Sequence, residues 1–402
     1  MPRWLPVIAS VWMIASASAQ DQLRLWVLQA PDRLVEYDVA TFQQRGSISV
    51  PAYVVTHSEH VKVGPRGQLL FQLPRDFQFG DAPELSGRLW FWDGAQARTW
   101  PSRDRQAFLS TDGQFLIWFA NTFAKDVDPD GNEKSVRTSA RVWRTDLSGR
   151  NEVTLVSIPP APACSCATGT CSESCPEWTM WARHGVVDDV FVLTQVTPGQ
   201  LEPSHERSVL YRREGAQWRP AVLPSPLEEI VESDASADML VATVLDAGCC
   251  GWINESSNQT ALTQGGRRTI LFDEFTRFGN SNYDISFYTV AAALTPGRLM
   301  IGHTIHGDVL EEEIRLSSDG KANAVALTKI RAAIAALPVT EIIELGAAPK
   351  VITTIPHVDL VGWLNDREFL GVEDGMLVVY DAHGAKLRTT AVRANRAAAF
   401  LR

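Results

Sequence analysis

The chain has 402 residues, with 47 acidic side chains against 37 basic ones and a formal net charge of −10. An acidic chain without a basic block does not fit nucleic acid as a partner, because phosphate binding requires clustered lysine and arginine. No stretch approaches 18 consecutive apolar residues, so we expect no transmembrane segment in the mature chain.

The N-terminus, MPRWLPVIASVWMIASASAQ, has the pattern of a secretory signal. Arg3 supplies a positive charge, residues 5–14 form a short apolar run, and Ala17-Ser18-Ala19 has the small-x-small form that signal peptidase cleaves. We therefore predict a signal peptide over residues 1–19 and a secreted or periplasmic mature chain. An uncleaved N-terminal membrane anchor is the alternative.

Strand-forming runs that end in an acidic turn recur along the rest of the chain. Each run is followed by an acidic residue and by turn-forming residues, as in the outer hairpin of a propeller blade. The acidic residues of these turns are Asp38, Asp93, Asp146, Glu214, Asp273, Asp319 and Asp381. Other β-prone hairpins lie between them, so the pattern predicts repeated units of four antiparallel strands.

One of these units carries a family resemblance. FLSTDGQFLIWFAN (residues 108–121) resembles the S-P-D-G-x-x-I-A-F signature of TolB-type and related WD-like bacterial propellers, with Thr111 where proline is usual. The following VWRTDLSGRNEVTLV (residues 142–156) is similar to the next strand of those repeats. The resemblance covers two or three blades. It implies a propeller fold and a periplasmic binding role, and it brings no catalytic residue to this chain.

DVDPDGNE (residues 126–133) resembles the start of a calcium loop, because Asp126, Asp128 and Asp130 alternate before a glycine. The match ends at Arg137, where a helical calcium-binding hand requires an acidic residue. Calcium is therefore a candidate cofactor of this loop, and no other cofactor is indicated. The alternative is a solvated acidic turn.

All six cysteines lie in two short windows of the sequence. They are Cys164, Cys166, Cys171, Cys175, Cys249 and Cys250. By blade order, the first window leads into the fourth blade, and the second lies between the second and third strands of the fifth. Both windows are therefore expected on one face of the propeller. In an exported chain an even number of cysteines favours disulfides.

We predict three disulfides that tie the loops of this face together. At least one should link residues 164–175 to the second window, because adjacent cysteines rarely bond to each other. A structural zinc site is one alternative, although C-x-C-x4-C-x3-C is not the paired C-x2-C form. An iron–sulfur or redox role is another.

ALTKIRAAIAALP (residues 326–338) departs from the strand pattern. Its apolar residues recur at helical spacing, and they are Leu327, Ile330, Ile334 and Leu337. The segment predicts a helix inserted between the last two blades. The preceding EIRLSSDGKANAVAL (residues 313–327) is expected to be an outer hairpin.

The clearest unit covers residues 357–392, where four β-prone runs alternate with turn signals. We predict one all-β domain over residues 20–402, a β-propeller of seven blades. The C-terminal AAAFLR (residues 397–402) is expected to close the ring as the innermost strand of the first blade, which removes exposed sheet edges. Six or eight blades, or a β-sandwich followed by a second β domain, are alternatives.

Histidines are expected at loops or strand ends of the cysteine-bearing face. They are His57, His60, His303, His306 and His357. Converging imidazoles can bind a metal or act as an acid or base, but isolated loop histidines are the commoner case.

Two functions fit these features. The first is an exported, non-catalytic propeller that binds a protein or other ligand through its loop-rich face, because the chain has no recognisable catalytic motif such as G-x-S-x-G or HExxH. The second is a metal-dependent hydrolase or lactonase at the mouth of the central channel. Its candidate residues are His60, His303, His306 and His357.

Overall fold

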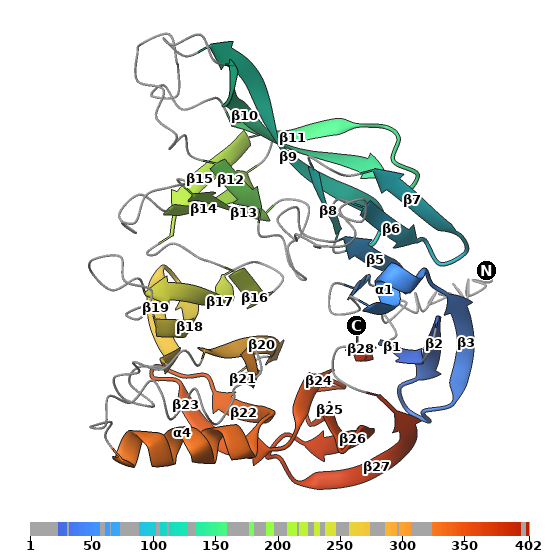
Figure 1. Ribbon diagram of the computed structural model, residues 1–402, viewed down its shortest axis with the longest axis vertical. Coiled ribbons are helices and arrows are strands. Elements are labelled where there is room, and N and C mark those ends of the chain that lie inside the picture. Colours follow the sequence, from blue (N-terminus) through green and yellow to red (C-terminus); the bar gives the residue numbers. More distant parts are fainter. Residues whose placement is uncertain are drawn as a thin grey trace, which may run out of the picture.

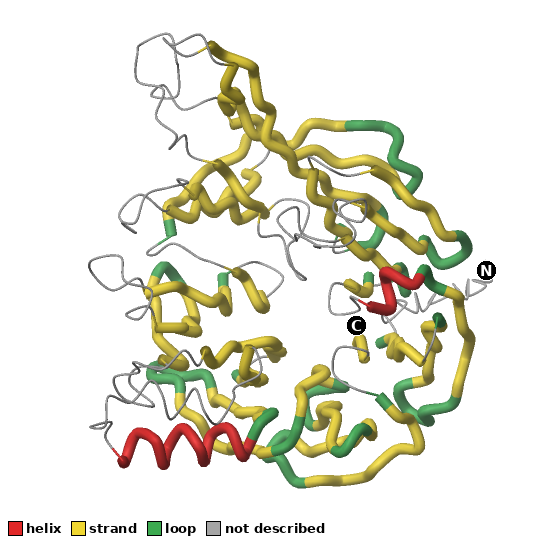
Figure 2. The backbone as a smooth tube through the Cα atoms, viewed as in Figure 1, coloured by secondary structure: helices red, strands yellow, loops and turns green. Residues whose placement is uncertain are grey.

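In the computed structural model the described regular secondary structure is almost entirely β-strand, as Figure 2 shows. The described helices are α1 (Ala52–Thr56) and α4 (Ala324–Ala336), and neither is long and apolar enough to cross a membrane. The described residues are 23–29, 32–56, 61–64, 66–72, 88–101, 105–110, 112–127, 133–158, 177–180, 190–196, 207–214, 217–223, 229–233, 238–246, 257–273, 286–295, 297–306, 324–394 and 399–401.

The described strands form seven sheets of four strands each, and neighbouring strands within a sheet are antiparallel. Six sheets contain consecutive strands. The second and third consist of β4 (Val61–Val63), β5 (Leu69–Gln72), β6 (Arg88–Trp92) and β7 (Ala97–Pro101), then β8 (Arg105–Leu109), β9 (Phe115–Val127), β10 (Glu133–Asp146) and β11 (Val153–Ile158). The fourth and fifth consist of β12 (Glu177–Met180), β13 (Val190–Val196), β14 (Arg207–Glu214) and β15 (Gln217–Val222), then β16 (Glu229–Ser233), β17 (Met239–Asp246), β18 (Ser257–Gln264) and β19 (Arg267–Asp273). The sixth and seventh consist of β20 (Ser286–Thr295), β21 (Arg298–His306), β22 (Val339–Glu344) and β23 (Lys350–Pro356), then β24 (Asp359–Trp363), β25 (Glu368–Glu373), β26 (Met376–Asp381) and β27 (Lys386–Arg393).

The first sheet combines the two ends of the chain. Its order is β28-β1-β2-β3, and its strands are β28 (Ala399–Leu401), β1 (Arg24–Gln29), β2 (Arg33–Asp38) and β3 (Gln44–Ser49). Trp26 of β1 lies opposite Phe400 of β28 in the antiparallel register. The C-terminal run therefore pairs with the first strand of the chain.

Each sheet packs against two neighbours, because successive side chains of a strand point to opposite faces. In β5, Leu69 and Phe71 pack with residues of the first sheet, whereas Leu70 packs with residues of the third. In β26, Val378 packs with the sixth sheet, and its neighbour Val379 packs with the first. Burial on both faces explains why these strands are continuous apolar runs rather than alternating ones.

Hydrophobic clusters of this kind join the sheets in order around the molecule (Figure 1). One cluster spans the third, fourth and fifth sheets, and another joins the seventh sheet to the first. Figure 1 shows β16, β20, β24 and β28 toward the centre of the arrangement. This is an all-β, propeller-like architecture.

The inserted helix does not lie where the sequence predicted it. Helix α4 lies between β21 and β22, inside the sixth sheet, rather than between the last two blades. The outer hairpin of this sheet is β22–β23 and not residues 313–327. The reason is burial, because Ile342 and Ile343 of β22 are nearly inaccessible to solvent and pack on opposite neighbouring sheets.

The outer hairpin of the fifth sheet also differs from the prediction. Asp273 ends β19 and does not form the turn. The turn between β18 and β19 consists of Gly265 and Gly266, with φ of 56° and 74°. Glycine adopts positive φ without steric penalty, so two glycines make a tight hairpin turn without an acidic cap.

Candidate functional site

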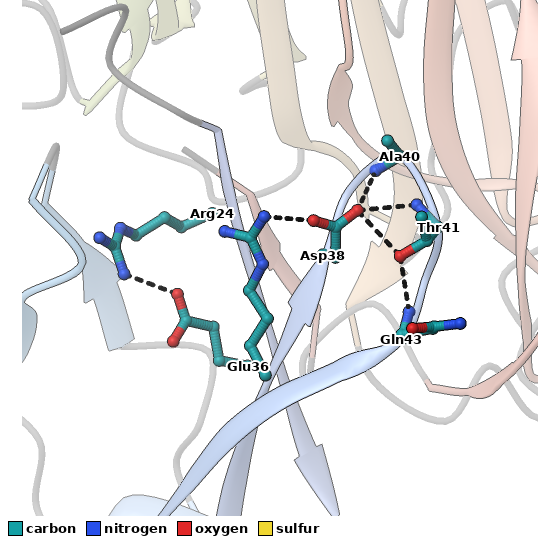
Figure 3. A network of polar contacts seen from close by, with 7 residues as sticks. Arg24, Glu36, Asp38, Ala40, Thr41 and Gln43 are labelled. Carbon is teal, nitrogen blue, oxygen red and sulfur yellow. Dashed lines mark hydrogen bonds and ion pairs between the residues drawn. The ribbon is translucent and has the colours of Figure 1, made fainter.

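Four of the predicted acidic turns contain an aspartate that binds backbone amides. In Figure 3, Asp38 Oδ1 accepts hydrogen bonds from the amides of Ala40 and Thr41, at 3.0 and 2.8 Å. The equivalent acceptors are Asp93, for Ala95 and Gln96; Asp146, for Ser148 and Arg150; and Asp381, for His383 and Ala385. These Asx turns each join the third and fourth strands of a sheet.

The hydrogen bonds favour the ionised form of each carboxyl group. The amide and hydroxyl of Thr41 lower the pKa of Asp38 to about 2, and Arg45 also binds this carboxylate. The hydroxyl of Ser148 and the amide of Arg150 lower the pKa of Asp146 to about 2. The carboxylates of these aspartates therefore stabilise the turns in which they lie.

The pKa values of the other two turn aspartates are lowered in the same way. Burial raises the pKa of Asp93, but hydrogen bonds from the amides of Gln96 and Ala95 outweigh this effect. The amide of Ala385 is the main cause of the lowered pKa of Asp381. All four carboxylates thus bind the backbone of short, described turns.

The antiparallel strand order places most of the long connections at one end of the sheets. In each sheet, the connections between the first and second strands and between the third and fourth strands lie at the same end, which we call the turn end. The opposite end, which carries the connections between second and third strands and from sheet to sheet, is the loop end. The long connections of the loop end include residues 73–87, 159–176, 197–206, 247–256, 274–285 and 307–323, which lie outside the described residues.

Both cysteine windows belong to connections of the loop end. Residues 159–176 link β11 to β12 and so lead into the fourth sheet. Residues 247–256 link β17 to β18, the second and third strands of the fifth sheet. These are the positions predicted from blade order. The cysteines themselves lie outside the described residues, so their disulfides stay a prediction.

One of the three predicted calcium ligands lies near the far end of the β9–β10 hairpin. Asp126 belongs to β9 and is opposite Lys134 of β10 in the register. Asp128 and Asp130 lie outside the described residues. Calcium binding therefore stays a prediction.

His303 forms a buried pair with a residue that the sequence did not indicate. Its Nε2 atom lies 3.1 Å from Oε2 of Glu341, and the two side chains are 5% and 3% exposed. The ring of Phe272 lies 4.6 Å from the imidazole, centroid to centroid. Because Phe272 belongs to β19, the pair lies where the fifth and sixth sheets meet.

Glu341 was missed because it lies in VTEIIE, which reads as an ordinary β-strand. The signal that could have found it is the carboxylate itself, since an ionisable residue inside a buried apolar strand usually has a partner. The residue opposite Glu341 in the register is Ile301, two positions before His303 on the same face of β21. The sequence does not show how β21 and β22 are aligned, so only the structure identifies His303 as the partner of Glu341.

The structure does not bring the other candidate histidines into this pair. His306 ends β21, and His357 is exposed on the link between the sixth and seventh sheets. His57 and His60 lie outside the described residues. Within the part of the chain that is described, no group of three or more His, Cys, Asp or Glu could hold a metal ion.

No protein-family model and no curated protein matches this chain. Among solved structures, it is similar to a functionally unknown protein from Desulfotomaculum acetoxidans DSM 771, at 8% identity and a TM-score of 0.40 over 95% of this chain and 98% of that one. Hydrazine synthase from Kuenenia stuttgartiensis is 13% identical, with a TM-score of 0.36 over 90% of each chain. The WD40 domain of SCAP from fission yeast is 8% identical, with a TM-score of 0.35 over 89% of this chain and 78% of that one. Likenesses this distant indicate no function, and none bears on the TolB-type resemblance in particular.

Proposed function

We propose that this protein is an exported, non-catalytic β-propeller that binds a protein or other ligand at its loop end. The observation that carries the proposal is the difference between the two ends of the sheets. Short turns, several of them capped by aspartate, close the turn end, except between β12 and β13, where the connection is residues 181–189. The loop end receives the long connections and all six cysteines. A rigid scaffold with long loops on one end is a common arrangement for binding.

The propeller in this proposal has seven blades and is closed by the C-terminal strand. The seven four-stranded sheets and the pairing of β28 with β1 support this count. Further support comes from the cluster in which Leu25 and Val27 pack with Leu370 and Leu377 of the seventh sheet. Without β28 the first sheet would have three strands, and the longer strand β1 would form its exposed inner edge.

Export and disulfide bonding belong to the same proposal. The signal pattern of residues 1–19 supports export, and export supplies the oxidising environment that the even cysteine count suits. Disulfides between the two cysteine windows would hold the loops of the fourth and fifth blades together. Calcium at Asp126, Asp128 and Asp130 would hold the hairpin of the third blade in a similar way.

The location of binding can be tested by site-specific photo-crosslinking in cells that export the protein. Exposed positions at the loop end are Asp32, Ala52 and Arg393, and matched exposed positions at the turn end are Ala40, Ala95 and Ala385. We expect crosslinkers at the loop-end positions to form an adduct of one defined additional mass, which corresponds to a protein or to a smaller ligand. Capture from the turn end alone, or from neither end, would contradict the proposal.

The hydrolase alternative has one supporting observation, the buried pair of His303 and Glu341. A carboxylate that orients a histidine is a frequent part of metal and acid–base sites. Metal analysis of the purified mature protein separates the two functions. A stoichiometric transition metal that is lost when His303 is replaced would favour the enzyme over the binding protein.

A further inference from the structure

The third sheet carries a hairpin that is longer than the sheet itself. β8 pairs with β9 only as far as Arg105 opposite Ala120, and β11 pairs with β10 only as far as Ile158 opposite Ala140. The pairs between β9 and β10 continue beyond both, to Val127 opposite Glu133. We call this two-stranded extension, residues 121–127 and 133–139, the arm. The arm belongs to the connection between the second and third strands and so lies at the loop end, and Figure 1 shows it projecting beyond the neighbouring sheets.

The arm leaves a strand edge available for pairing. The strand order is β8-β9-β10-β11, with β8 innermost, so the edge of β10 over residues 133–139 is on the outer side of the sheet. No strand among the described residues pairs with this edge. Two-stranded ribbons are marginally stable in water, and an unpaired edge is a template for another strand.

We propose that this edge pairs with the same edge of a second copy of the chain. The two β10 strands would run antiparallel about a two-fold axis that passes by Ser135. In this register Glu133 lies opposite Arg137 of the partner subunit, and Arg137 lies opposite the partner subunit's Glu133. Opposite charges directly across an antiparallel pair are stabilising, and a two-fold axis repeats each pair.

The charge sequence of the arm selects this register. Residues 133–139 read EKSVRTS. If the two-fold axis passed by Lys134 or by Arg137, that residue would lie opposite the same residue of the partner subunit, and like charges would face each other. A register shifted by one residue from the one centred on Ser135 would place Lys134 opposite the partner's Arg137, which are again like charges. Of the registers that overlap three or more arm residues, only the one centred on Ser135 places opposite charges together.

Because the arm extends from the loop end and the two β10 strands would run antiparallel, the two loop ends would point in opposite directions, toward each other, with the paired arms between them.

Charge reversal tests the proposal on the mature full-length protein. We expect sedimentation equilibrium to show a dimer for the wild type. Glu133→Lys and Arg137→Glu should each raise the dimer dissociation constant roughly tenfold, because each turns two attractive pairs into repulsive ones. The double variant Glu133→Lys/Arg137→Glu should restore the wild-type constant. Matched controls are Glu344→Lys and Arg393→Glu, exposed charges outside the arm, which should leave the constant unchanged.

A second measurement does not depend on charge. Ser135→Cys places a thiol on the two-fold axis, so oxidation should give a covalent dimer in which the peptide containing position 135 is linked to itself. A monomeric wild type would overturn the proposal. So would a dimer that neither single reversal weakens, a double variant that stays weakened, or a Ser135→Cys variant that forms no such link.

Discussion

Trp363 of the seventh sheet donates its indole N–H to the backbone carbonyl oxygen of Ala293 in the sixth, at 3.0 Å. Both groups are buried, and the bond joins the innermost strands β24 and β20. Trp26 provides a natural comparison, because its buried indole N–H has no hydrogen-bond partner among the described residues. The two tryptophans differ in this one polar contact while both fill space between sheets.

Trp363→Phe should therefore destabilise the protein more than Trp26→Phe. Both substitutions lose apolar volume, but only the first leaves a buried carbonyl without its donor. We expect the free energy of unfolding to differ by about 1–2 kcal/mol between the two variants. Denaturant unfolding followed by circular dichroism measures this difference, and equal losses would show that the bond between Trp363 and Ala293 contributes nothing.

The aspartate turns predict a loss of stability in acid. The pKa values of Asp38 and Asp146 are about 2 in the folded state, against an ordinary value of 3.8. Because the folded-state pKa is the lower one, these carboxylates stabilise the fold fully above pH 3.8 and lose that contribution as the pH falls toward 2. Asp146→Asn should flatten the pH dependence of unfolding in this range.

Asp366→Asn is the control for this experiment. Asp366 is exposed in the turn between β24 and β25, where Asn365 accepts the hydrogen bonds from the turn amides. The control variant should keep the wild-type pH dependence. If both variants behave alike, the turn aspartates do not determine the response to acid.

The pair of His303 and Glu341 should be energetically coupled. Removing one member leaves a polar group buried between the fifth and sixth sheets, which is costly. A double-mutant cycle with His303→Ala and Glu341→Ala should give a coupling energy of about 1–3 kcal/mol in urea unfolding. A coupling energy near zero would mean that the two side chains are adjacent without stabilising each other.

Pairing between β28 and β1 predicts that the C-terminus stabilises the entire domain. Deleting residues 399–402 exposes the edge of β1 at Leu25, Trp26 and Val27. We expect a lower melting temperature in a single transition and more aggregation, because an exposed apolar edge recruits other strands. A truncated protein that melts like the full-length chain would contradict this role of β28.

The cysteines should form three disulfides, with at least one between residues 164–175 and the pair at 249–250. Such a bond closes a long loop of the unfolded chain and should contribute at most about 4 kcal/mol. Peptide mapping without reduction identifies the bonds, and the reduced protein is the comparison for stability. Three bonds that each join cysteines of the same window would contradict the predicted link between the windows. Six free thiols would contradict the disulfides altogether and favour a metal site.

Local chemistry is the part of this structure that could be predicted in detail. The Asx turn at Asp146 uses amides only two and four residues away, so the sequence TDLSGR contains every group that the turn needs. Apolar runs such as LLF and LVVY likewise indicate strands buried on both faces. The placement of the cysteine windows followed from counting these local units in order.

Contacts between distant strands needed the tertiary structure. SSDG reads as a good hairpin turn, yet the outer hairpin of the sixth sheet is β22–β23, because burial between two sheets outweighs local turn preference. Glu341 reads as a surface residue of a strand, and its partner His303 is 38 positions away.

The sequence by itself determined the repeating unit and the turns that cap it, since both depend on residues near one another or on a repeated pattern, and it predicted the pairing of the chain ends that the structure shows. The tertiary structure decided which strand edges stay open and which side chains meet between sheets. These depend on register and packing, where a shift of one residue moves every side chain of a strand to the opposite face.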